Sequence, residues 1–200
     1  MNIALEISPQ DRALRRIQTL SRPLNVLLSI ALGLAILFLL FEVLFLLCFP
    51  LLGSPHAFLS FNEWGVNLSI GAYPDLNDPA FVPVANLAPG RRLIAAVLGA
   101  VCTGCTVLVL IQLRGLFVLY SRGIVFSAGN VARIKMFGLW LIVTAIVTNV
   151  AGRLFTRLLG APEHGIPNAA MAVILGAMIY VIAYVMELGR EADLERKDFI

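Results

Sequence analysis

Charged residues are scarce in this chain. Asp, Glu, Lys and Arg make up 14% of its 200 residues and hydrophobic residues make up 60%, whereas a soluble domain has about 25% and about 45–50% respectively. The net charge of +3 is small, and no basic stripe with interleaved aromatic residues is present. The composition therefore argues against an ordinary soluble domain and against direct binding of nucleic acid.

Cysteine and histidine are also rare, with three and two residues respectively. Cys102 and Cys105 form a C-x-x-C pair, which in a chain this apolar is similar to the quinone-coupled disulfide-forming oxidoreductases of bacterial inner membranes. A redox dithiol needs an accessible, acidified thiolate, however, and this pair lies in the middle of an apolar run. We therefore rank a membrane-embedded redox enzyme third among the possible functions, behind the two hypotheses described below. His56 and His164 follow no metal-ligand spacing, so we expect no metal and no cofactor.

Four long apolar runs account for the composition. None of them contains Asp, Glu, Lys or Arg, and they cover Leu24–Phe41, Leu93–Leu113, Met136–Gly152 and Ile166–Met186. A helix that rises about 1.5 Å per residue needs roughly 20 residues to cross a hydrocarbon core of about 30 Å. We therefore predict an all-α integral membrane protein, a bundle of four transmembrane helices that forms a single membrane domain.

The basic residues predict the orientation of these spans. Of the 15 Lys and Arg residues, eleven fall in the N-terminal arm, the second connection and the tail, and four fall in the other two connections. The positive-inside rule then places both termini in the cytoplasm. The predicted order is a cytoplasmic amphipathic arm 1–23, span 24–49, outer loop 50–92, span 93–113, cytoplasmic loop 114–135, span 136–152, outer loop 153–165, span 166–186 and cytoplasmic tail 187–200.

Two segments outside the spans carry further structure. Ser8 and Pro9 are typical of a helix start, and the arm that follows is either an interfacial helix on anionic lipid or a solvated lead-in to the first span. In the long outer loop, Phe58–Phe61 and Val66–Ile70 alternate apolar and polar residues on either side of a turn, which predicts a short β-hairpin. We favour an ordered outer loop that caps the helices over a disordered one.

Small residues line the second span. Ala95, Gly99 and Thr103 recur at every fourth position, and Ala96, Ala100 and Gly104 follow one residue later. Such ridges let helix backbones approach closely in lipid. They predict packing within the chain, and self-association into a homo-oligomer is the alternative. Ala172 and Gly176 form a weaker counterpart in the fourth span.

Polar residues inside the spans are the candidates for a ligand site. Glu42 lies near the outer boundary of the first span, and Asn149 lies near the outer end of the third. An ionisable residue inside a span indicates function by default, although an interfacial carboxylate also explains Glu42 at that depth. These two residues support a rival hypothesis, a small transporter or ligand receptor in which Glu42 and Asn149 face an intramembrane cavity.

The most patterned stretch outside the membrane runs from Leu113 to Gly138. It reads L-R-x-L-F-x-x-Y-x-x-G-x-x-F-x-x-x-N-V-x-R-I-K-x-x-G, with Gly123 as a predicted helix C-cap and Ser127 as the cap of the next helix. This order resembles the signature of the bacterial membrane-protein family called domain of unknown function 2975. A final span that runs into a charged tail, here Val185–Glu195, is similar too, whereas Glu195–Ile200 departs from the family's usual ending.

The resemblance implies a four-span protein of the bacterial cytoplasmic membrane without established catalytic residues. Members are often encoded beside small helix-turn-helix regulators, which implies a separate cytoplasmic protein as partner. Our leading hypothesis is therefore a non-enzymatic regulatory or interaction partner that presents the cytoplasmic loop and the charged tail to such a protein. The candidate residues in the loop are Arg114, Tyr120, Gly123, Phe126, Asn130 and Arg133.

Overall fold

Four long helices dominate the structure, a computed structural model that describes residues 9–52, 57–62, 65–71, 81–123, 127–160 and 169–198. The helices are α1 (Pro9–Leu52), α2 (Pro89–Ser121), α3 (Ala128–Leu159) and α4 (Ala169–Asp198). All four are long and apolar enough to cross a membrane. The predicted site residue Phe126 lies outside the described residues, as do His56 and His164.

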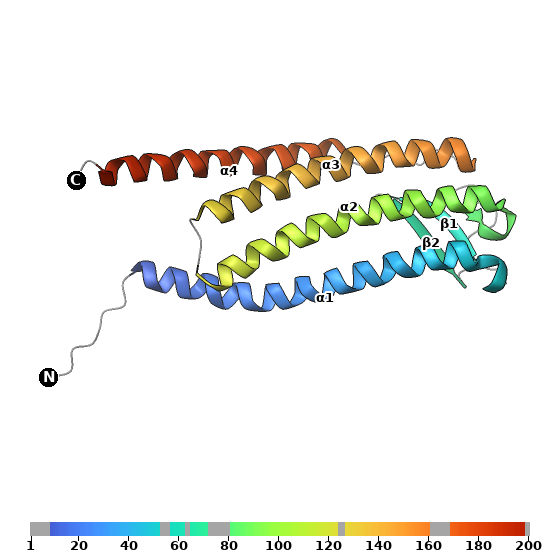
Figure 1. The fold of residues 1–200 in the computed structure, drawn as a ribbon, viewed down its shortest axis with the longest axis horizontal. Coiled ribbons are helices and arrows are strands. Elements are labelled where there is room, and N and C mark those ends of the chain that lie inside the picture. The colour runs from blue at the N-terminus through green and yellow to red at the C-terminus, as the bar shows by residue number, and fades with distance from the viewer. Residues whose placement is uncertain are drawn as a thin grey trace.

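The helices pack in the order of the chain (Figure 1). Helix α1 packs on α2, α2 on α3 and α3 on α4, while the other helix pairs meet only marginally within the described part of the chain. The first turn of α1 and the last turn of α4 lie at the same end of the molecule, which we call the termini end. The opposite end, where the strands lie, is the hairpin end. The four helices therefore form a row that stays open between α1 and α4.

Helix α1 is a single helix of 44 residues that begins at Pro9, as predicted, and joins the arm to the first span without a break. Its buried side chains include Ser21, Leu28 and Glu42, which stand at multiples of seven residues. A heptad spacing keeps one stripe of a helix against a neighbour over a long distance. The stripe faces α2 along most of α1, and it is the reason that a polar residue such as Glu42 points into the protein.

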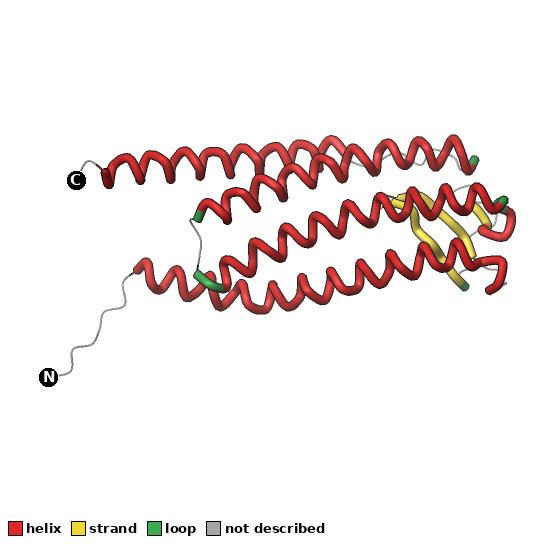
Figure 2. Tube along the Cα trace, viewed as in Figure 1, coloured by secondary structure: helices red, strands yellow, loops and turns green. Residues whose placement is uncertain are grey.

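A small antiparallel sheet lies at the hairpin end (Figure 2). Strands β1 (Ala57–Asn62) and β2 (Gly65–Ile70) pair in register, with Leu59 opposite Leu68, and confirm the predicted hairpin. A third strand, β3 (Val82–Pro83), pairs with the other edge of β1. The sequence did not predict β3, because two residues that include a proline carry no strand pattern.

The sheet packs on helices α1, α2 and α3 and buries a shared apolar core. Leu59 of β1 and Val84 beside β3 have no exposed surface, and neither does Phe155 of α3. The Phe61 ring lies 5.5 Å from the Phe155 ring, centroid to centroid. Core residues from all of these elements are Phe45, Leu46, Ala57, Leu59, Val66, Val84, Leu87, Ala95, Ala96, Phe155 and Leu159. The outer loop therefore packs beside the helices and does not only cap their ends.

A glycine crossing sets the stagger between α3 and α4. A Cβ atom on Gly138 would lie 2.7 Å from the Gly176 carbonyl oxygen, and a Cβ atom on Gly176 would lie 2.7 Å from the Gly138 carbonyl oxygen. From this crossing α3 runs to Leu159 at the hairpin end, whereas α4 reaches only back to Ala169. Helix α3 thus extends about 20 Å further at a rise of about 1.5 Å per residue. The sheet covers the part of α3 that α4 does not reach.

Candidate functional site

Two polar regions stand out from the apolar helices, one at each end. At the termini end, α2 ends at Ser121 and Gly123 adopts a φ of +76°, a conformation that glycine adopts without strain. The backbone N–H of Gly123 donates to the Tyr120 carbonyl at 2.9 Å. Helix α3 begins beyond Ser127, whose hydroxyl accepts from the Asn130 N–H at 3.2 Å. Both predicted caps are confirmed, and they mark the end of α2 and the start of α3.

Helix α1 is joined to this connection by polar side chains. The Arg114 Nε donates to the Ser29 hydroxyl at 2.8 Å, and that hydroxyl donates in turn to the Asn25 carbonyl at 2.7 Å. Six residues before the apolar run begins at Leu24, the Gln18 amide lies so close to Gly123 that a Cβ on Gly123 would be 2.5 Å from the amide nitrogen. The arm of α1 therefore packs on the end of α2, which explains why both Arg114 and Gly123 have a structural partner.

Arg133 crosses from α3 to the backbone of α2. Its guanidinium lies directly against Gly115, where a Cβ atom would fall 1.7 Å from Nη1. Only a glycine leaves room for that group at this position. Asn130, one turn earlier on the same helix, is completely buried, and Val131 is 3% exposed. Two predicted site residues of α3, Asn130 and Arg133, are thus held between helices at the termini end.

Helix α4 is tied to the same region by an ion pair. The Lys135 ammonium contacts the Glu187 carboxylate and lies 5.4 Å from the centre of the Tyr184 ring. The side chain of Tyr120, on α2, is half-buried and meets the Phe117 ring edge-on at 6.0 Å. The structure therefore gathers Arg114, Tyr120, Gly123, Asn130 and Arg133 at one end of the helices, together with the Lys135–Glu187 pair.

The second polar region surrounds Glu42, nearer the hairpin end. Glu42 is completely buried, and neither carboxylate oxygen has a hydrogen-bond partner among the described residues. The carboxyl group fits against Gly99 of α2, where a Cβ would lie 2.2 Å from Oε1. The predicted small-residue ridge thus packs within the chain at Ala95, Ala96 and Gly99, whereas Gly104 meets open space. Self-association through the ridge stays a prediction.

Cys102 links this carboxyl group to α3 and to the hairpin. The Cys102 thiol is buried, and it interacts electrostatically with Glu42 and with the side chain of Thr148. Gly65, at the start of β2, packs on it so closely that a Cβ would be 2.7 Å from the Cys102 Cβ. Glu42, Cys102 and Thr148 form a polar group between three helices, which we call the Glu42 cluster.

Asn149 is next to Thr148 in the sequence, but it is not hydrogen-bonded to the Glu42 carboxyl group. It is half-buried on α3. The three cysteines, Cys48, Cys102 and Cys105, are free thiols, and the last two are buried. No group of three or more His, Cys, Asp or Glu residues that could hold a metal ion occurs in the described part of the chain. The Glu42 cluster therefore offers one carboxyl group, one thiol and one hydroxyl.

Several of these contacts were not predicted from the sequence. Gly115 lies inside the patterned loop, but nothing in its local sequence says that an arginine eighteen residues later would cover it. Ser29 and Gln18 carry no motif. The ion pair between Lys135 and Glu187 is the one contact among these that the sequence could have predicted. The two residues carry opposite charges at the inner ends of the third and fourth predicted spans, and such residues are expected to meet when antiparallel helices pack.

Comparison with known proteins identifies the family but no characterised relative. A family model described as "Protein of unknown function (DUF2975)" matches residues 71–191, which include α2, α3 and most of α4. No curated protein matches the chain, and no solved structure matches it. Because the match covers more than half of the sequence and includes the whole patterned loop, the chain belongs to the DUF2975 family.

Proposed function

We propose that this chain is a multi-pass protein of the bacterial cytoplasmic membrane, with both termini in the cytoplasm, and acts as a non-enzymatic regulatory partner of a cytoplasmic protein. The observation that carries the proposal is the gathering of the loop residues at the termini end. Arg114, Gly123 and Arg133 come from two helices and one connection, yet all three contact a neighbouring helix. A surface of this kind is held in one shape by tertiary contacts and suits recognition by a protein.

The charged end of α4 supports the same proposal. The helix continues to Asp198 and extends past the first turn of α3, so the segment after Glu187 is presented as a helix (Figure 1). This segment alternates acidic and basic residues. Such a strip suits docking by complementary charge, which favours rapid association and selects between partners. A small helix-turn-helix regulator, as the resemblance implies, is the first partner to test.

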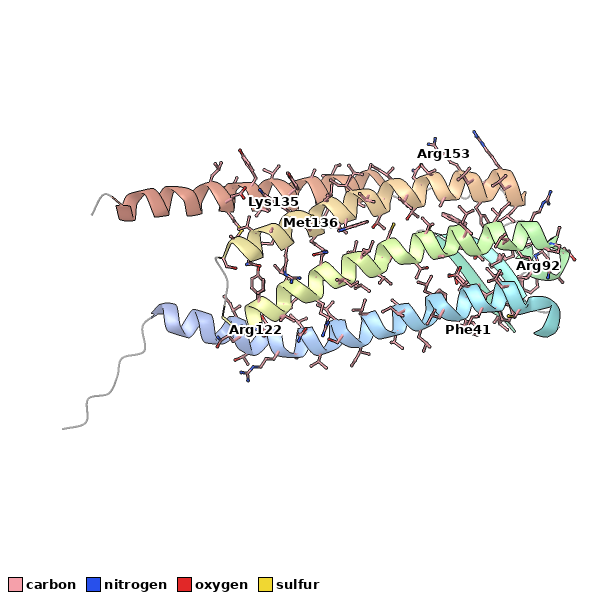
Figure 3. All side chains as sticks on the ribbon, viewed as in Figure 1. Phe41, Arg92, Arg122, Lys135, Met136 and Arg153 are labelled. Atoms are coloured by element: carbon pink, nitrogen blue, oxygen red, sulfur yellow. The ribbon has the colours of Figure 1, made fainter. Side chains whose placement is uncertain are left out.

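Photocrosslinking in intact cells tests the proposal directly. A photoreactive amino acid replaces Arg122 at the termini end, Lys197 in the charged tail, or Arg153 as a control at the hairpin end of α3 (Figure 3). The proposal expects a protein adduct from the first two positions and none from the third, with the adduct reproduced by the purified regulator. Equal adducts at all three positions, or adducts from the control alone, would contradict it.

Orientation has its own test. In a cysteine-free background that retains normal expression, single cysteines replace Arg122 or Arg153. A membrane-impermeant maleimide added to intact cells with a permeable outer envelope should label R153C and spare R122C until the membrane is disrupted. The reverse pattern would place both termini outside and remove the cytoplasmic partner from consideration.

A second candidate function rests on the Glu42 cluster. A fully buried carboxyl group without a hydrogen-bond partner in the described residues is unusual in a stable protein. Inside a span such a residue indicates a transport or receptor role by default. The candidate predicts that Glu42→Gln abolishes binding or uptake of a cationic or polar solute while the protein still folds. Wild-type solute profiles in E42Q cells, with the crosslinks at Arg122 retained, would favour the first function.

A further inference from the structure

Basic side chains outnumber acidic ones at the termini end. Arg22, Arg114 and Arg122 are exposed and Arg133 is half-buried, and none of them contacts a carboxylate among the residues whose side chains are described. Glu187 is the acidic group described at this end, and Lys135 already binds it. The positive-inside rule explains an excess of basic residues on one side of a membrane, but it requires no particular placement of any one of them.

Arg133 is placed in a particular way. Its guanidinium lies against the α2 backbone at Gly115, a position that only a residue without a Cβ can offer. The helix carbonyls around Gly115 are occupied by the helix itself, because this part of α2 is regular. A guanidinium has five N–H donors in a planar fork, and partial burial without an anionic partner is unfavourable. An anion beside Gly115 would therefore stabilise the half-buried Arg133 guanidinium.

The depth of Arg133 indicates where that anion comes from. Arg133 stands three residues before Met136, where the third apolar run begins, and Gly115 stands two residues after Leu113, where the second apolar run ends. At the level of the guanidinium, α3 thus changes from polar to apolar, and α2 carries Arg114, the first charged residue after its apolar run. In a bilayer this is the level of the phosphate groups, and basic sites between helices at that level bind anionic headgroups.

Exposed apolar side chains complete the site. Met136 and Leu139 follow Arg133 along α3 and are 40% and 44% exposed. Arg122 stands seven residues after Gly115, on the same stripe of α2, and is exposed at its end (Figure 3). A phosphate beside two arginines with an apolar strip leading away from it matches a phospholipid better than a soluble phosphate compound.

We infer that α2 and α3 hold the headgroup of an anionic phospholipid at the termini end, with Arg133 on Gly115 as the main phosphate contact and Arg122 as a second one. The site shares Arg122 and Arg133 with the surface proposed for the protein partner, but its occupation by lipid requires no cytoplasmic protein and is tested on the purified chain alone. It also gives Gly115 a specific role, which is to seat the guanidinium at the correct depth and angle.

Native mass spectrometry of the full-length protein tests this inference. The protein is purified in detergent and titrated with phosphatidylglycerol or with phosphatidylcholine of the same acyl chains. Wild-type protein should retain phosphatidylglycerol several-fold better. Arg133→Gln should weaken that retention about fivefold, the effect expected for one basic residue near a lipid surface. Arg153→Gln, an exposed arginine at the hairpin end of the same helix, should change it less than twofold.

The decisive variant keeps every charge. Gly115→Ala displaces the Arg133 guanidinium, since the new Cβ would overlap Nη1, and should reduce phosphatidylglycerol retention as much as R133Q does. Gly104→Ala, on the same helix in open space, should have no effect. If G115A binds lipid like G104A, charge alone explains the basic residues and the inference is wrong.

Two further outcomes would also overturn it. Equal retention of phosphatidylglycerol and phosphatidylcholine by the wild type would show no headgroup site. Competition by millimolar inorganic phosphate at the same strength would show a free-anion site in place of a lipid site. Arg133→Lys provides a folded variant if R133Q is unstable; it keeps the charge without the fork and should retain an intermediate amount of phosphatidylglycerol.

Discussion

The two ends of this protein use the same helices in different ways. At the hairpin end, apolar side chains from the sheet and from α1, α2 and α3 close over a single carboxyl group, and the core includes side chains with no exposed surface. At the termini end, the same three helices are joined by Arg114, Gln18 and Arg133, which reach a hydroxyl group or a glycine. Apolar packing resists change, whereas long polar side chains can move aside. The hairpin end is thus held by a continuous apolar core, whereas the termini end is held by a few long polar side chains.

The largest expected effect is the loss of stability from a substitution in the core of the hairpin end. Leu59→Ala removes a side chain without exposed surface from the shared core and should lower the free energy of unfolding by about 2–5 kcal/mol. Reversible unfolding in mixed detergent micelles measures the change. Ile70→Ala, in β2 of the same sheet at a position 43% exposed, is the control and should cost far less. Equal costs at the two positions would mean that the hairpin does not pack on the helices.

The second prediction compares the same type of substitution, glycine to alanine, at the two ends. Gly152→Ala places a Cβ 2.8 Å from the Phe61 ring, which is itself packed on Phe155, and should destabilise the protein by about 1–3 kcal/mol. Gly115→Ala meets only the end of the flexible Arg133 side chain, so stability should be unchanged or raised by up to about 1 kcal/mol. Thermal unfolding in one detergent compares the two variants. A larger loss for G115A than for G152A would reverse the distinction between the ends.

The third prediction concerns the carboxyl group inside the hairpin end. Glu42→Met keeps a similar shape and removes a buried polar group that has no hydrogen-bond partner in the described residues. Stability should rise by about 1–2 kcal/mol, because the cost of taking the carboxyl group out of water disappears. Glu42→Gln should gain less, since its amide still needs partners. A clear loss of stability in E42M would show that the carboxyl group has a stabilising partner.

The smallest effect belongs to a single polar contact at the termini end. The Arg114–Ser29 hydrogen bond joins two helices at a position where Arg114 is exposed. A double-mutant cycle with Arg114→Gln and Ser29→Ala should give a coupling energy of about 0.5–1 kcal/mol. The pair Arg153→Gln and Ser29→Ala, with no contact between the residues, should show none. A coupling of several kcal/mol would mean that the termini end is as rigid as the hairpin end.

Much of the fold could be predicted from local pattern. The apolar runs predict the four long helices, alternation predicts the hairpin, and the residues Gly123 and Ser127 predict the turn between α2 and α3, because each of these signals is decided by a residue and its near neighbours. The apolar runs alone do not give the full lengths of α1 and α4. Both helices continue beyond their apolar runs into charged segments, where hydropathy gives no boundary although helix propensity persists.

The candidate site was predicted only in part. The patterned loop supplies most of the candidate residues, and the structure brings Arg114, Gly123, Asn130 and Arg133 of that loop to one end of the helices. The sequence predicts Glu42 near the membrane boundary, facing either headgroups or a cavity, and in the structure its carboxyl group is buried against Gly99. Asn149 and Glu42 were grouped as one ligand site, yet no hydrogen bond joins them in the structure.

The sequence by itself determined the four apolar helices, the caps at Gly123 and Ser127, the hairpin and the family. Tertiary structure alone decided that the hairpin covers the end of α3 that α4 leaves free, that Glu42 meets Gly99 and that Arg133 seats on Gly115. The physical reason is the stagger between long helices. It depends on where two glycines far apart in the chain, Gly138 and Gly176, let their backbones touch, and no local pattern carries that distance.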